Sequence, residues 1–414
     1  MVMTRLGYIA VKREATLATA VKPSHFLRFK DGDLKYAQEV IENNPIQNNR
    51  WNALNAVAGK ISTDASFNID LDYNECVHFL SAALGGMSSA DISSLTDASV
   101  YRHTITFANS LPSLSLEQLK GDGTDTATNR QKYEVLRGYG VLVDQIKISS
   151  SDGIINLEVG LKAHGVFSSA FMIANAAAGS NVNIALDTVE GLVATSDTVN
   201  IYDATPQNET DAIASISTAN KTIQIATLGN SYTVANGGKV ELTPQTPSYG
   251  TPAQVWSFTH ASFQFATTLA GCAAASEVNV EDWELTYMNN LEERFGSLRA
   301  SPSVIAPKGA KATLKFTKYF ETLADRDIFK QITKTACLLT INNNKIVSAT
   351  DTGNAKYQVQ FELNNLRFTS YDNPTGTDDL YAVAVEATVF YDDTDAQAIR
   401  CLVQNAKVWT EYTA

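Results

Sequence analysis

Hydrophobic and polar residues alternate along most of this chain, which predicts a protein built mainly of β-strands. The clearest alternation runs through residues 60–71, where the apolar positions are Ile61, Ala65, Phe67, Ile69 and Leu71. Successive side chains of a strand point to opposite faces of a sheet, so we expect one buried face and one face in water. The polar positions that form the wet face are Ser62, Asp64, Ser66, Asn68 and Asp70.

A short helix is expected directly after this strand, over residues 74–84. Its apolar residues fall on one helical face, Asp72 or Asn74 can cap its start, and Gly85-Gly86 ends it. Strands are then expected over 101–107 and 113–119. A hairpin follows, with strands over 141–148 and 155–161 around the turn Ser151-Asp152-Gly153.

The last third of the chain repeats this order of elements. A strand over 311–317 precedes a helix that Asp325 can cap, with Ile328, Phe329 and Ile332 on one face. Strands over 337–341, 357–368 and 380–391 follow, the last two around a turn at 373–376. The repeated order favours a tandem duplication. Chance similarity of two β-rich segments is the alternative.

Residues 168–250 differ from both flanking parts, because they contain short, evenly spaced β segments separated by turns. This pattern is typical of a small barrel or sandwich. We expect an insertion whose ends lie close together and which sits on the outside of the parent fold. The expected division is therefore 1–167 for the N-terminal unit with an N-terminal arm, 168–250 for the insert, and 251–414 for the C-terminal unit. The apolar piece 396–414 is expected to pack back on a sheet.

Composition and charge narrow the function classes. The 32 basic and 44 acidic residues give a net charge of -12, which argues against a chain that grips nucleic acid phosphates. The opening residues lack the apolar core of a signal peptide, and no run of about 20 apolar residues occurs, so neither export nor membrane spanning is indicated.

Residues that carry chemistry are few and dispersed. The four cysteines and five histidines form no metal-ligand spacing, and no nucleophile elbow, phosphate loop or dinucleotide fingerprint is present. We therefore expect buried or inert thiols, no metal, no cofactor and no enzyme activity.

The N-terminal residues resemble those of bacteriophage tail tube proteins. The resemblance covers about the first 85 positions, including the run Gly7–Pro23, the element 42–51 and the Gly-Lys pair at 59–60 that opens the alternating strand. The residues that carry the family pattern are Gly7, Glu14, Thr16, Pro23, Arg50 and Gly59.

The resemblance implies a fold of duplicated tail-tube-type β-sandwich or half-barrel units, each with a flanking α-helix, plus the inserted small β-barrel or sandwich domain. It further implies rings that stack into a tube, the conduit for genome ejection, in the virion after assembly in the host bacterial cytoplasm. A duplicated chain needs three copies per ring, and an unduplicated one needs six.

The partners that the resemblance implies are other copies of the chain, the tape measure protein, the tail terminator, baseplate or tip proteins, and viral DNA that passes without specific binding. No membrane is involved. The residues Ser62, Asp64, Ser66, Asn68 and Asp70 are the candidates for the lumen surface, with an ordinary solvated outer face as the alternative. We also expect the loop 121–131 to contact the next ring.

Two other function classes stay open from the sequence. The Thr-, Ser- and Asn-rich insert, with Tyr202 and Tyr232, would suit a glycan-binding or adhesive virion surface protein. A hydrolase with dispersed carboxylates would use the acidic residues around Trp283, which are Glu281, Asp282, Glu284, Glu292 and Glu293.

Overall fold

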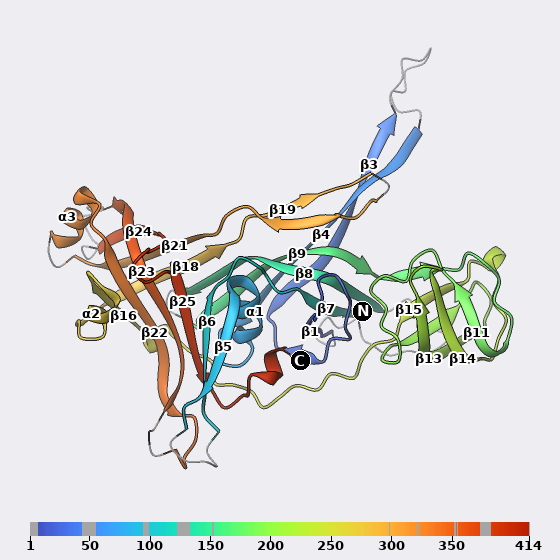
Figure 1. Ribbon diagram of the computed structural model, residues 1–414, viewed down its shortest axis with the longest axis horizontal. Coiled ribbons are helices and arrows are strands. Elements are labelled where there is room, and N and C mark those ends of the chain that lie inside the picture. Colours follow the sequence, from blue (N-terminus) through green and yellow to red (C-terminus); the bar gives the residue numbers. More distant parts are fainter. Residues whose placement is uncertain are drawn as a thin grey trace.

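The computed structural model describes residues 7–43, 55–93, 99–121, 133–150, 153–297, 299–320, 323–351, 353, 355–372 and 382–413. Strands dominate these residues and the helices are short (Figure 1), which confirms the mainly β prediction. Apart from Gly121, the loop at 121–131 lies outside the described residues, as does the turn at 373–376. Of the turn at 151–153 only Gly153 is described.

The described residues of the first unit form nine strands and one helix before the insert. They are β1 (Ile9–Arg13), β2 (His25–Leu27), β3 (Asp31–Asn43), β4 (Asn55–Asp70), α1 (Cys76–Leu84), β5 (Gly85–Asp91), β6 (Tyr101–Phe107), β7 (Leu114–Gly121), β8 (Tyr133–Ser150) and β9 (Asn156–Phe167). The strands expected over 60–71, 101–107 and 113–119, and both strands of the hairpin around 153, are confirmed.

Helix α1 forms where the sequence predicts it, and all nine of its residues are buried. Asp72 stabilises the turn that precedes the helix, because the Asp72 Oδ1 atom accepts hydrogen bonds from the backbone N–H groups of Asn74 (2.6 Å) and Glu75 (2.7 Å). The N-cap residue itself is Glu75, whose side chain makes no cap bond. The helix ends at Gly85, whose φ of 93° is a left-handed conformation that glycine adopts without strain.

The second unit follows the insert. Its elements are η4 (Phe258–His260), β16 (Ala261–Ala266), α2 (Leu269–Cys272), β17 (Glu277–Val278), β18 (Val280–Met288), β19 (Leu291–Arg294), β20 (Val304–Pro307), β21 (Lys311–Tyr319), α3 (Ala324–Gln331), β22 (Thr335–Ile346), β23 (Lys356–Asp372), β24 (Ala382–Val389), β25 (Ile399–Asn405) and α4 (Thr410–Thr413).

Strand pairing repeats between the two units, all of it antiparallel. In the first unit β1 pairs with β2 and β7, β3 with β4, β4 with β9, and β8 with β7 and β9. In the second unit β16 pairs with β17 and β22, β18 with β21, β21 with β24, and β23 with β22 and β24. Helix α1 follows β4 in the chain, and helix α3 follows β21, the counterpart of β4. This shared topology is the structural form of the duplication that the order of elements predicts.

Two strand pairs join the units into one sheet. Strand β18 of the second unit pairs with β8 of the first. The C-terminal strand β25 lies between β23 and β6, so the apolar piece at 396–414 does pack back on a sheet, as predicted. The buried faces of both units form a single hydrophobic cluster that includes Phe67, Val143, Leu314 and Phe361.

The insert is a separate six-stranded sheet, at the opposite end of the molecule from α3 (Figure 1). Its strands are β10 (Ser169–Phe171), β11 (Gly179–Ala185), β12 (Thr198–Tyr202), β13 (Asn208–Ser217), β14 (Thr222–Leu228) and β15 (Lys239–Leu242), with the 3-10 turn η3 (Val234–Asn236). In spatial order β10 and β11 are the two outermost strands of this sheet. A β-bridge between Met172 and Leu186 brings the ends of these two strands together. Ser169 lies opposite Glu241, so the two ends of the insert are adjacent.

Two expectations about single elements are wrong. Asp325 does not cap α3, since Leu323 is the N-cap residue, and Asp325 instead forms an ion pair with Lys318 at 2.5 Å. Ile332 does not share a helical face with Ile328 and Phe329, because it is the left-handed C-cap (φ 49°) and is 62% exposed.

The described N-terminal residues include a strand of the core as well as exposed segments. Ile9, Ala10 and Val11 are fully buried between β2 and β7. What projects from the body is the hairpin of β3 and β4, and the β19–β20 ribbon runs beside it (Figure 1). We call the β3–β4 hairpin the first arm and the β19–β20 ribbon the second arm. The backbone N–H of Ile61 donates a hydrogen bond to the carbonyl of Ala300 (2.8 Å), which links the two arms. The N-terminal arm stays a prediction.

Candidate functional site: a polar sheet face with open edges

One face of the long sheet is polar from the first unit to the second. It is formed by the alternate residues of β4, β9, β8, β18, β21 and β24 whose neighbours along each strand fill the core. The five candidate lumen residues all lie on it. Asp64 and Ser66 are exposed, and Ser62, Asn68 and Asp70 are half-buried, while Ala65, Phe67 and Ile69 between them are buried.

The charges on this face are mixed. Carboxylates and lysines alternate across neighbouring strands: Asp64 lies opposite Lys162 and Lys35, Glu158 opposite Lys147, and Lys315 opposite Glu284 and Glu386. Lys147 Nζ contacts Glu284 Oε2 at 2.8 Å, and this hydrogen bond raises the pKa of Lys147. An entirely acidic surface is thus excluded for the described part of the face, where Lys35, Lys147, Lys162 and Lys315 each lie opposite a carboxylate and Lys311 lies opposite Met288.

The carboxylates around Trp283 do not meet as a catalytic pair. Glu284 is bonded to Lys147, and Glu292 forms an ion pair with Lys308 at 3.0 Å on the separate β19–β20 ribbon. Trp283 itself is buried in the core. These contacts favour structural roles on the sheet surface over the hydrolase interpretation.

The two ends of the long sheet have open edges. Among the described residues β3 pairs with β4 alone, and residues 369–372 of β23 pair with β24 alone. Near its start the β3 edge is partly capped by side chains of β7. Gln118 Oε1 accepts from the Leu34 N–H (2.7 Å), while Gln118 Nε2 and Lys120 Nζ donate to the carbonyls of Gly32 (3.2 Å) and Leu34 (3.1 Å). From Lys35 onward the edge is exposed.

Glu14, one of the family-pattern residues, holds the N-terminal segment against β7 and β8. Its carboxylate is 5% exposed and accepts bonds from the Ser113 hydroxyl (2.7 Å), the Ser115 hydroxyl (2.7 Å), and the N–H groups of Gly140 (2.9 Å) and Ala18 (3.1 Å). Burial raises the pKa of Glu14, and these four donors oppose that shift. Glu14 thus has a structural role.

The other family-pattern residues are spread along the first unit. The Thr16 carbonyl accepts from the Thr19 N–H (3.0 Å) in the turn after β1, and Pro23 is buried with its carbonyl bonded to Gln245 (3.1 Å). Gly7 lines a groove of about 1070 Å³ along the start of β3, and a Cβ atom at Gly59 would lie 3.0 Å from Glu39. Arg50 is outside the described residues. The structure does not bring these residues together.

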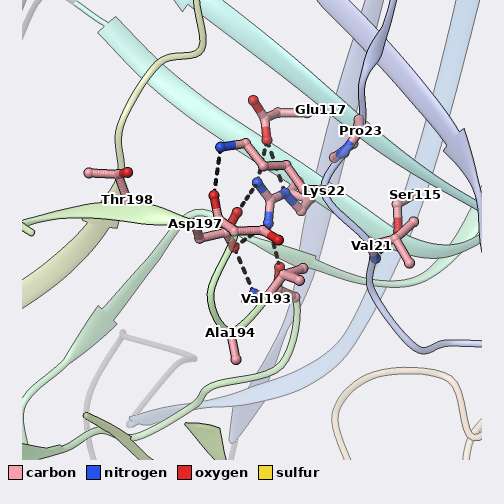
Figure 2. Close-up of polar contacts among 12 residues, drawn as sticks. Val21, Lys22, Pro23, Ser115, Glu117, Val193, Ala194, Asp197 and Thr198 are labelled. Atoms are coloured by element: carbon pink, nitrogen blue, oxygen red, sulfur yellow. Dashed lines mark hydrogen bonds and ion pairs between the residues drawn. The ribbon is translucent and has the colours of Figure 1, made fainter. Parts of the chain in front are cut away.

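A buried ion triad, which the sequence does not reveal, attaches the insert to the first unit. Glu117 and Asp197 approach from β7 and from the insert (Figure 2), and Arg137 of β8 lies between them. The Arg137 guanidinium donates to Glu117 (2.6 and 2.9 Å) and to Asp197 (2.9 Å), and all three side chains are at most 1% exposed. Beside the triad, Lys22 Nζ donates to the Ser196 carbonyl (2.7 Å).

Two further sequence expectations concern the insert and the thiols. Tyr232 is fully buried and Tyr202 donates to Glu241, so this pair does not form an open aromatic surface for a glycan. The four cysteines are buried free thiols, as expected.

Within the described ranges, no group of three His, Cys, Asp or Glu side chains is arranged to hold a metal ion. None of the helices described there has the length and apolar content needed to cross a membrane.

The fold and its edges define a class of protein. Two like β units share one sheet, one face of that sheet is polar, and an open strand edge remains at each end, an arrangement typical of proteins that associate through their sheets. A family model described as phage tail tube protein matches residues 4–379, so the chain belongs to the phage tail tube protein family. It is a structural protein of the phage tail and a component of the virion. The search of curated proteins returns no match.

Proposed function

We propose that this chain assembles into rings of three copies, each copy supplying two units, and that the rings stack into the tail tube through which the genome passes during ejection. The observation that carries the proposal is the pairing of β8 with β18. Through it the two units of one chain share a continuous sheet. Three such chains would supply six like units, which suits the division of the chain at 1–167, 168–250 and 251–414.

The polar face is the proposed lumen surface. Most of its lysines lie opposite carboxylates, so few cations are left free to hold DNA phosphates. Each free phosphate contact would add salt-dependent binding of the DNA. Before ejection the same surface would contact the tape measure protein. The tail terminator and the baseplate or tip proteins would meet the two ends of the tube.

The insert is proposed to lie on the outside of the tube. It is attached at the Arg137–Phe167 end of the β8–β9 hairpin, away from the segments of these strands that carry Lys147 and Glu158. No cofactor and no enzyme activity belong to this proposal.

Electron microscopy of the purified protein and of the lysate in which it is made tests the proposed function. We expect hollow tubes built of stacked rings, with three chains in each ring. Six chains per ring would contradict the pseudo-sixfold arrangement, because twelve units would then surround the lumen. Discrete monomers at every concentration, with no tubes in the lysate, would contradict the tube itself.

A further inference from the structure

Corresponding strands of the two units can be aligned residue by residue. In the first unit Leu34, Ala65, Leu161 and Val143 lie in one row across β3, β4, β9 and β8. In the second unit the row is Leu285, Leu314, Ala387 and Phe368 across β18, β21, β24 and β23. A β-bulge follows directly after Val143 in β8 and directly after Phe368 in β23. Because bulges mark defined positions in a sheet, they fix the alignment of β3 with β18 and of β8 with β23.

The junction inside the chain then shows how one unit joins the next. Strand β18 pairs with the end of β8, with Tyr287 opposite Ile146. Both residues are buried, with Tyr287 only 5% exposed. Six residues beyond Leu285, Leu291 at the base of the second arm is 7% exposed and packs with Leu142 of β8. This junction therefore buries the start of the following unit's arm on the preceding unit.

The counterparts of Tyr287 and Leu291 are exposed on β3, and Tyr371, the counterpart of Ile146 at the end of β23, is half-buried. Tyr36, two residues after Leu34, is 50% exposed, and Val40, six residues after it, is 65% exposed. On the other edge Ser370 and Asp372 are exposed. The open β3 edge, with its exposed apolar side chains, is a site for pairing with another chain.

We propose that β3 of one copy pairs antiparallel with the end of β23 of a second copy, in the register of the β8–β18 junction. Tyr36 then lies opposite Tyr371, Lys35 opposite Asp372, and Ala37 opposite Ser370 of the second copy. The opposite charges of Lys35 and Asp372 agree with this register. The capping of Gly32 and Leu34 by Gln118 and Lys120 places the start of the new pairing at Lys35.

This inference rests on the proposed function, since it states which edges close the ring. It also assigns a role to the projecting β3–β4 hairpin, whose exposed apolar residues include Val40, Ile41 and Val57. By analogy with Leu291 on Leu142, that hairpin lies on the C-terminal unit of the neighbouring copy.

Disulfide trapping tests the register. The variant Ala37→Cys with Ser370→Cys carries two exposed thiols, and the four native cysteines are buried. Directly opposite residues have Cβ atoms about 4.5–5.5 Å apart, close enough for a disulfide after a small adjustment. After mild oxidation of assembled protein, we expect disulfide-linked species of three chains on non-reducing gels.

Two matched pairs of cysteines control the experiment. Gln145→Cys with Met288→Cys is the equivalent pair inside the chain and is expected to form an intramolecular bond. The second control is Ala37→Cys with Glu386→Cys. Glu386 lies directly opposite Ser370 on the next strand, β24. In the proposed pairing residue 386 is therefore two strand spacings, about 10 Å, from residue 37. We expect this pair to yield about tenfold less cross-linked product.

The outcomes for the junction and for the tube are distinct. Tubes that form without the 37–370 bond, while the 145–288 bond forms, would overturn the junction and leave the proposed function standing. The 37–370 bond in open chains with no tube would support the junction and contradict the proposed function. Absence of both the bond and any assembly would overturn both.

Discussion

At the scale of single residues, two buried carboxyl groups lie at the start of α1. Asp72 and Glu75 are 8% and 6% exposed, and Arg28 reaches Glu75 from the segment before β3 at 3.4 Å. Burial, and next the neighbouring Asp72, raise the pKa of Glu75 to about 8, and burial also raises the pKa of Asp72. A pKa above the ordinary value of 4.5 means that folding favours the protonated form of Glu75.

The first prediction concerns the pH dependence of stability. Since the folded-state pKa of Glu75 is raised, the stabilisation it contributes is fully present below about pH 4.5 and is lost as the pH rises through about 8. Glu75→Gln keeps the neutral form at every pH. We expect the variant to match the native chain in free energy of unfolding near pH 4.5 and to exceed it by about 1 kcal/mol or more at pH 8.5, measured by urea denaturation.

The comparison variant is Glu411→Gln, whose carboxylate is 41% exposed. It should leave the difference between the two pH values unchanged. A Glu75→Gln variant that is less stable than the native chain at pH 8.5 would show that Glu75 acts as a charged partner of Arg28, contrary to the prediction.

At the scale of elements, the insert is attached to its parent unit by charge as well as by apolar packing. Its core residues pack in one cluster with Tyr8, Phe26 and Phe167 of the first unit. The Glu117–Arg137–Asp197 triad crosses the same boundary. Tyr8 and Gln245 complete the surroundings of Glu117, donating to its Oε1 atom at 2.5 and 2.8 Å.

The second prediction is that Arg137→Met destabilises this boundary. It leaves two buried carboxylates without a cation, and breaking a buried ion pair on one side typically costs about 3–5 kcal/mol. We expect a corresponding fall in the free energy of unfolding and release of the insert as a fragment in limited proteolysis. Arg294→Met is the matched control, because its side chain is 70% exposed and surface ion pairs contribute about 0–1 kcal/mol. Equal losses in the two variants would contradict the assigned role of the triad.

Elements also differ in how far local sequence predicts them. Strand β4 follows its apolar periodicity closely, because it buries one face against the core. Helix α1 forms where its apolar residues predict it, but it is buried on every side, including at His78 and Ser81. Helix α3 departs from it, since its residues are only partly buried and Ile332 turns away as a left-handed cap. The triad is invisible to pattern analysis, because Glu117, Arg137 and Asp197 lie on three separate segments whose contact depends on the folded chain.

At the scale of the whole molecule, the polar face is the surface that the proposed function assigns to the lumen. Asp64 is exposed between Lys35 and Lys162, and Asp70 forms an ion pair with Lys30 at 2.5 Å. Both carboxylates therefore balance cations on the same face or at its edge.

The third prediction is that Asp64→Lys with Asp70→Lys slows genome ejection. The double variant adds cations and frees existing ones, so the proposed lumen would hold DNA phosphates at low salt. We expect ejection at least about twofold slower, an effect that added salt reduces, with ring formation unchanged. Asp327→Lys with Asp393→Lys changes the net charge equally at exposed positions outside the polar face. Unchanged ejection in the first variant would remove Asp64 and Asp70 from the lumen.

The sequence by itself determined the local structure of this protein and its family. Alternation in β4, the apolar face of α1 and the repeated order of elements depend on neighbouring residues, so they can be read along the chain. Only the tertiary structure decided which distant strands pair, that β25 lies between β23 and β6, and that lysines interleave with carboxylates on the polar face. Those features depend on strand register and on bulges, which arise from contacts between residues far apart in the chain.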